Sequence, residues 1–102
     1  MAIKLISPEE LKKLIDNNNS VQLVDIREKY ELEVEGKSNA VHIPMGELVD
    51  KLAEIPEREN IIFHCSSGQR SSNILNFMLM NGLYKDNYYS LKGGFKAWSE
   101  IN

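Results

Sequence analysis

Short apolar runs alternate with segments of helical pattern along this chain, and that alternation restricts the fold more than any other feature. Five runs are expected to form β-strands: residues 3–6, 21–25, 40–44, 61–65 and 88–91. The segments between them repeat apolar residues at helical spacing, as Leu11, Leu14 and Ile15 do. Strands that alternate with helices predict an α/β fold, a three-layer sandwich whose mostly parallel central sheet of about five strands has helices on both faces.

The boundaries of several helices follow from local signals. Ser7 is expected to cap a helix that begins at Pro8, because Glu10 completes a capping box with it. A later helix is expected over residues 71–80, and residues 45–55 also carry apolar side chains at helical spacing. Ligands of such folds bind at the carboxyl ends of the strands. The runs at 21–25 and 61–65 end in Asp25 and Cys65, so both residues are expected at that edge.

The composition excludes several classes of protein. The chain has 102 residues without a repeat or a low-complexity tract, so we expect one domain spanning residues 1–102. A formal net charge of -3 and the lack of a Lys/Arg cluster argue against a nucleic-acid partner. One cysteine permits neither an internal disulfide nor a Cys-rich zinc site, and the two histidines show no metal-ligand spacing. No apolar run suits a membrane span or a signal peptide, so we expect a cytoplasmic protein, monomeric by default.

The single cysteine is the strongest candidate for chemistry. Cys65 ends an apolar run, and a loop of small and flexible residues then leads into a helical pattern. A thiol at the end of a strand, with a helix start behind it, meets loop N–H groups and the positive end of the helix dipole. Both favour a thiolate and a charged sulfur intermediate, so we expect Cys65 to be a nucleophile. The alternative is that Cys65 is only a small buried hydrophobic residue.

The residues that follow the cysteine are candidates for substrate binding: Ser66, Ser67, Gly68, Gln69, Arg70 and Ser71. Gly68 is expected to provide a positive φ angle or a close approach of the backbone to the ligand. Arg70 offers a planar fork suited to oxyanions, unless it is a solvated surface residue. The serine hydroxyls can donate hydrogen bonds to a bound anion, although Ser71 is equally suited to cap the helix.

Three motifs resemble the rhodanese family of sulfurtransferases, and the resemblance covers nearly the whole chain. Residues 25–27, with Glu31 following, are similar to the family's Asp-x-Arg segment and its downstream acidic residue. Residues 65–71 match a Cys-x-x-Gly-x-Arg-Ser loop, and residues 91–98 are similar to a Leu-x-Gly-Gly-x-x-x-Trp ending. Residues 35–40 depart from the family's Gly-His-Ile-x-Gly-Ala segment, which leaves their local conformation open.

The resemblance implies a rhodanese-like fold and a double-displacement sulfur transfer without a metal or another cofactor. Cys65 would take the outer sulfur of a donor such as thiosulfate and pass it from a persulfide to cyanide in an assay, or to a thiol or partner protein in the cell. No second cysteine is present to act as a resolving thiol, so the acceptor must come from outside. Asp25 and Arg27 would lie beside the loop in a structural role, with Arg27 paired to Glu31. His64 is expected to face the other side of the sheet from Cys65, as a satisfied or half-exposed histidine and not a general base.

Two other functions remain open. Cysteine phosphatases and arsenate reductases share this fold and a similar Cys loop, but phosphatases place five residues between the cysteine and the arginine. Here four residues, 66–69, separate them, and Ser71 stands where a phosphatase has its arginine, so the shorter cradle favours a persulfide sulfur over phosphate. A sulfur relay that serves one protein partner needs the same loop. Turnover with small donors and acceptors alone distinguishes the relay from a free enzyme.

Overall fold

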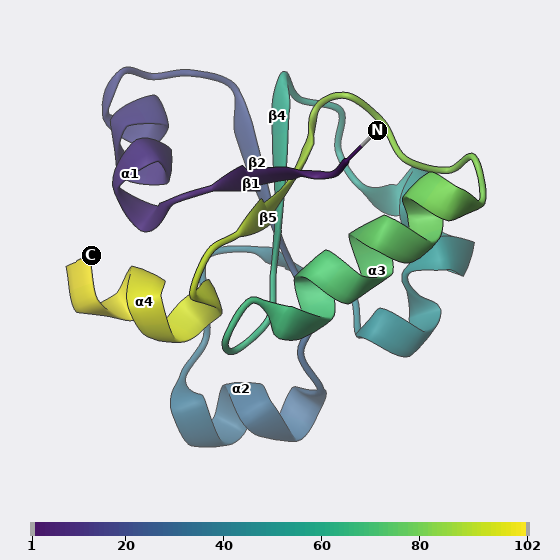
Figure 1. Ribbon diagram of the computed structural model, residues 1–102. Coiled ribbons are helices and arrows are strands. Elements are labelled where there is room, and N and C mark those ends of the chain that lie inside the picture. The colour runs from purple at the N-terminus through teal and green to yellow at the C-terminus, as the bar shows by residue number, and fades with distance from the viewer. Residues whose placement is uncertain (1, 102) are drawn as a thin grey trace.

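The computed structural model describes residues 2–101, and its centre is a five-stranded sheet with helices on both faces (Figure 1). The strands are β1 (Lys4–Ile6), β2 (Val21–Asp25), β3 (Val41–His42), β4 (Asn60–His64) and β5 (Tyr88–Leu91). The helices are α1 (Pro8–Asp16), α2 (Lys29–Glu35), α3 (Gln69–Met80) and α4 (Gly94–Ile101), with the short 3-10 helices η1 (Met45–Glu47) and η2 (Val49–Glu54).

All pairings in the sheet are parallel, and the strand order is β1-β5-β4-β2-β3. This confirms the predicted α/β fold, since each parallel crossover needs a helical connection over one face of the sheet. The carboxyl ends of the strands therefore lie at one edge. Asp25 ends β2 there, and Cys65 follows the last residue of β4 directly.

Two apolar cores, one on each face of the sheet, account for the three layers. Along β4 the side chains alternate, so that Phe63 packs in the core that includes Leu75 of α3. Ile62 packs on the opposite face in the core that includes Leu11 of α1 and Trp98 of α4. Helix α2 lies below the strand ends in Figure 1, close to the turn between β4 and α3.

Helix boundaries agree with the sequence where capping signals are strong and differ where they are weak. The capping box is formed, because the amide of Glu10 donates to Ser7 Oγ at 3.0 Å and the Ser7 amide donates to Glu10 Oε1 at 3.0 Å. Residues 45–55 contain two 3-10 helices and no α-helix, and the second is kinked at Lys51, whose backbone is non-helical (φ -115°, ψ 16°). Among residues 2–101, no helix combines the length and the apolar character that crossing a membrane requires.

Candidate active site

Backbone amides converge on the sulfur of Cys65. The amide of Gly68 donates to Cys65 Sγ at 3.1 Å, and the amide of Ser71 lies 3.5 Å from the same atom. The thiol itself lies 3.8 Å from Ser71 Oγ and is fully buried. The loop thus forms the amide cradle that the sequence predicts, with the start of the 12-residue helix α3 behind it.

Gly68 allows the loop to turn tightly enough for this cradle. Its φ angle is +96°, and it is the N-cap residue of α3. A Cβ atom at this position would lie 3.1 Å from both Leu91 O and Gly93 N. The positive φ expected for Gly68 is confirmed, and the close approach seen here is to the backbone of residues 91 and 93. The expectation that Ser71 caps the helix is wrong, because α3 begins two residues earlier, at Gln69.

The start of α4 fixes the backbone of the cysteine loop from the other side. The amide of Phe95 donates to Cys65 O at 2.8 Å, and the amide of Lys96 donates to Ser66 O at 3.1 Å. This approach leaves no room for a side chain at Gly94, where a Cβ would lie 2.6 Å from Cys65 O. The Gly-Gly segment is recognisable in the sequence as a family motif, but its contact with the cysteine loop is not.

Arg70 points toward α2 and is held there by Glu31. Its Nη1 and Nη2 atoms donate to the two carboxylate oxygens of Glu31 at 2.8 and 2.6 Å. Hydrogen bonds from Arg70 lower the pKa of Glu31, and the same contact raises the pKa of Arg70. The expected pairing of Arg27 with Glu31 is therefore wrong. Arg70 is partly exposed but it is not a free solvated side chain.

Arg27 binds Asp25 instead, beneath the loop. Both residues are buried, and Nε and Nη2 of Arg27 donate to the Asp25 carboxylate at 3.0 and 2.8 Å. Burial alone raises the pKa of Asp25, but the hydrogen bonds from Arg27 outweigh it and leave the pKa below its usual value. The ring of Phe95 covers the guanidinium, with its centroid 4.1 Å from Cζ. The pair joins the end of β2 to α4 and so supports the loop.

His64 faces the opposite side of the sheet from Cys65 and is hydrogen-bonded, in agreement with the sequence expectation. Its Nε2 lies 2.9 Å from Ser38 Oγ, and its ring stacks against Phe95. Ser38 Oγ also donates to Asp25 Oδ2 at 3.3 Å. Burial lowers the pKa of His64, and this outweighs the opposite effects of the Asp25 carboxylate and the Cys65 carbonyl.

The other loop residues differ in where their side chains lie. Ser66 Oγ donates to Glu35 Oε1 at 2.9 Å. Ser67 is exposed, and Gln69 Nε2 donates to Asn73 Oδ1 at 3.1 Å, within α3. Glu35 and Ser38 also neighbour the site, and neither was expected from the sequence. The one feature of the sequence that sets them apart is that they belong to residues 35–40, which depart from the family pattern.

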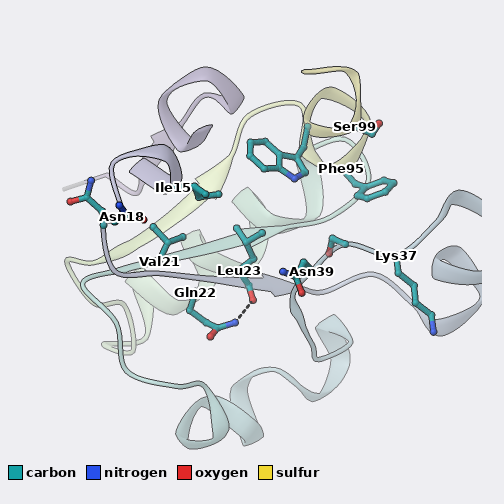
Figure 2. A pocket seen from close by; sticks show the side chains of 12 residues that line it. Ile15, Asn18, Val21, Gln22, Leu23, Lys37, Asn39, Phe95 and Ser99 are labelled. Carbon is teal, nitrogen blue, oxygen red and sulfur yellow. Dashed lines mark hydrogen bonds between the residues drawn. The ribbon is translucent and has the colours of Figure 1, made fainter. Parts of the chain in front are cut away.

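A large hollow of about 990 Å³ lies on the α1 and α4 side of the sheet. In Figure 2, Val21 and Leu23 of β2 lie opposite Phe95 and Ser99 of α4. None of residues 65–71 lines this hollow. It is therefore separate from the amide cradle, although Phe95 belongs to the linings of both regions.

Comparison with known proteins places this architecture in a family. A family model described as "Rhodanese-like domain" matches residues 7–101. "Putative sulfurtransferase YtwF" of Bacillus subtilis (strain 168) is 34% identical over 98 residues, which cover 96% of this chain and 92% of that protein. "Thiosulfate sulfurtransferase GlpE" of Actinobacillus pleuropneumoniae serotype 7 is 32% identical over 93 residues, 91% of this chain and 83% of that protein.

A solved structure agrees with these relatives. The crystal structure of a rhodanese-like domain protein from Staphylococcus aureus superposes with a TM-score of 0.76 at 30% sequence identity, covering 94% of this chain and 91% of that one. The sequence match and the fold thus point to the same family over the same residues. This chain belongs to the rhodanese-like domain family, whose named relatives here are sulfurtransferases.

Proposed function

We propose that this protein is a sulfurtransferase of the thiosulfate type in which Cys65 carries the sulfur as a persulfide. The family and its relatives support sulfur transfer in general. The observation that carries the proposal is the convergence of the Gly68 and Ser71 amides on Cys65 Sγ. Preorganised N–H donors stabilise negative charge on the sulfur as the persulfide forms.

The reaction has two displacement steps. In the first, the Cys65 thiolate attacks the outer sulfur of a donor such as thiosulfate, the donor S–S bond breaks, and sulfite leaves with the bonding electron pair. In the second, an acceptor nucleophile attacks the outer sulfur of the persulfide, and the Cys65 thiolate leaves with the electron pair of that S–S bond. Two easier steps replace one difficult transfer, which is the gain from covalent catalysis.

The acceptor comes from outside the chain. Cys65 is the only cysteine, so no internal thiol exists to resolve the persulfide. Cyanide serves as the acceptor in an assay, and a thiol or a partner protein serves in the cell. The loop residues Ser66, Ser67, Gly68, Gln69, Arg70 and Ser71 would then meet the donor as it reaches the sulfur.

The loop geometry favours sulfur over phosphate as the transferred group. Four residues separate Cys65 from Arg70, one fewer than the phosphatase pattern requires. Two of the guanidinium donors of Arg70 are also occupied by Glu31, which leaves fewer to surround a phosphate dianion. Oxyanion hydrolysis is therefore the weaker interpretation of this site.

Steady-state kinetics with thiosulfate and cyanide test the proposal. The two-step mechanism predicts parallel lines in double-reciprocal plots at several cyanide concentrations, because sulfite leaves before cyanide binds. Intersecting lines would exclude a persulfide that forms before the acceptor arrives. Hydrolysis of a phosphate ester with no sulfur transfer would support the phosphatase interpretation instead.

The Arg70→Ala variant tests how far the arginine contributes to donor binding. Arg70 keeps donors that Glu31 does not use, so removing it is expected to lower kcat/KM for thiosulfate by a factor on the order of 10–100, the effect of one charged hydrogen bond. Arg58→Ala is the matched control, since Arg58 is exposed and lies just before β4, at the opposite end of that strand from Cys65. Equal kinetics in the two variants would show that the amides alone bind the anion.

A further inference from the structure

The thiol of Cys65 is closed off from solvent, although sulfur transfer needs it to meet two outside reactants in turn. The side chain is 0% exposed. The amides of Gly68 and Ser71 contact Sγ at 3.1 and 3.5 Å. A persulfide adds a second sulfur atom about 2 Å from Sγ. The loop must therefore move to admit a donor and to hold the product of the first step.

Helix α2 holds this loop at two points that differ in strength. Glu31 binds Arg70 through both carboxylate oxygens, and its side chain is 9% exposed. One turn later on the same face, Glu35 binds the Ser66 hydroxyl through a single oxygen, and its side chain is 33% exposed. Of the two attachments, the contact between Glu35 and Ser66 is the one that a small movement can break.

A buried guanidinium N–H group of Arg27 lies close to the same carboxylate. Arg27 Nη1 is fully buried and has no hydrogen-bond partner among residues 2–101, and it lies 3.6 Å from Glu35 Oε1. That distance is roughly half an ångström longer than a good N–H···O hydrogen bond. A buried donor of a charged group is costly to leave unpaired. A short movement of Glu35 toward Arg27 would therefore compensate for the loss of its bond to Ser66.

We propose that Glu35 is a positioning residue that closes and opens the loop over Cys65 by exchanging its partner between Ser66 and Arg27. With the carboxylate on the Ser66 hydroxyl, the loop is closed over the thiol. With the carboxylate on Arg27, the Ser66 hydroxyl is released, and Ser67 moves to expose Sγ to the donor or acceptor while the Gly68 amide stays on the sulfur. The proposal rests on the proposed role of Cys65 as the sulfur carrier.

The part of the loop that moves is small. The amides of Phe95 and Lys96 hold the carbonyls of Cys65 and Ser66 on α4, and Glu31 holds Arg70 at the far end. Between these points lie Ser67, Gly68 and Gln69, and the Gly68 carbonyl accepts from the Ser72 amide at 3.2 Å. Ser67 is exposed and is the residue that can move. The backbone of Cys65 therefore stays in position while the loop at Ser67 moves.

The rate at which iodoacetamide alkylates Cys65, followed by intact mass, measures access to the thiol. Glu35→Ala and Ser66→Ala both remove the closing contact and are expected to raise that rate about 10-fold, the effect of one hydrogen bond to a charged group. Glu35→Gln keeps an acceptor oxygen for Ser66 and is expected to stay within about twofold of the unmodified protein. Glu33→Ala makes the same charge change on the exposed side of α2 and is the matched control.

Thermal unfolding distinguishes the exchange of partners from a general loosening of the fold. Ser66→Ala is expected to keep its Tm, because Glu35 then binds Arg27. Glu35→Ala is expected to lower the Tm, because it leaves the buried guanidinium without that carboxylate. Equal Tm losses in both variants, or alkylation rates that neither variant changes, would overturn the proposal.

Measuring persulfide formation in the same samples tests the role of Glu35 separately from the proposed sulfur transfer. A persulfide on Cys65 with unchanged alkylation in every variant would reject the role of Glu35 and leave the sulfur carrier in place. Faster alkylation in Glu35→Ala and Ser66→Ala without any persulfide would support the moving loop and reject the sulfur chemistry.

Discussion

Cys65→Ser is expected to abolish sulfur transfer and leave the fold intact. A hydroxyl with no adjacent base is a poor nucleophile, so turnover with thiosulfate should fall by roughly 10³-fold or more. The serine Oγ can accept the Gly68 amide that now donates to Sγ, so the buried hydroxyl is satisfied and the free energy of unfolding should change little. Turnover measures the loss of sulfur transfer, and urea unfolding of the same sample measures the free energy of unfolding.

Cys65→Ala is the control for the nucleophile. It removes the reacting atom without adding a buried hydroxyl, so it should be as inactive as the serine variant. Turnover in either variant at a level comparable with that of the unmodified protein would overturn the assignment of Cys65. Loss of activity together with unfolding would show only that Cys65 is needed for packing, since it is part of the core on the α3 side.

Gly94→Ala is expected to have the second largest effect, through the backbone of the cysteine loop. The new Cβ would lie 2.6 Å from Cys65 O and 2.6 Å from both the carbonyl carbon and oxygen of Ser66, so the loop or α4 must shift. The residue also has a φ of +58°, which L side chains rarely adopt. We expect a loss of about 2–4 kcal/mol in the free energy of unfolding, and the loss of most activity even in the folded fraction.

Gly82→Ala separates the clash from the backbone strain. Gly82 has a similar φ of +72°, but no atom lies within 4 Å of the position of its Cβ. This variant should lose roughly 1 kcal/mol and keep its transfer rate per folded molecule. If Gly94→Ala were no worse than Gly82→Ala in activity, the packing of α4 against the loop would not matter to the reaction.

The sheet and the amide cradle were predictable because their signals are local. The strands β2 and β5 have the limits expected from their apolar runs, Val21–Asp25 and Tyr88–Leu91. The order of strands and helices defines a parallel sheet with its ligand edge at the carboxyl ends, and Cys65 lies at that edge. The capping box at Ser7 is equally local, and it is formed as predicted.

The side-chain pairs around the cradle were not predictable, because they join segments far apart in the sequence. The family resemblance suggested Arg27 as the partner of Glu31, four residues away. The actual partner is Arg70, 39 residues away, since Arg27 is buried against Asp25. The contact between Glu35 and Ser66 spans 31 residues and depends on where α2 lies below the sheet.

The intact mass of the protein after incubation with thiosulfate tests the central claim most directly. The account predicts a gain of one sulfur, about 32 Da, that disappears on addition of cyanide and is absent in Cys65→Ser. A mass that does not change at any thiosulfate concentration that supports turnover would contradict a persulfide on Cys65. The same would hold for an adduct that persists in the Cys65→Ser variant.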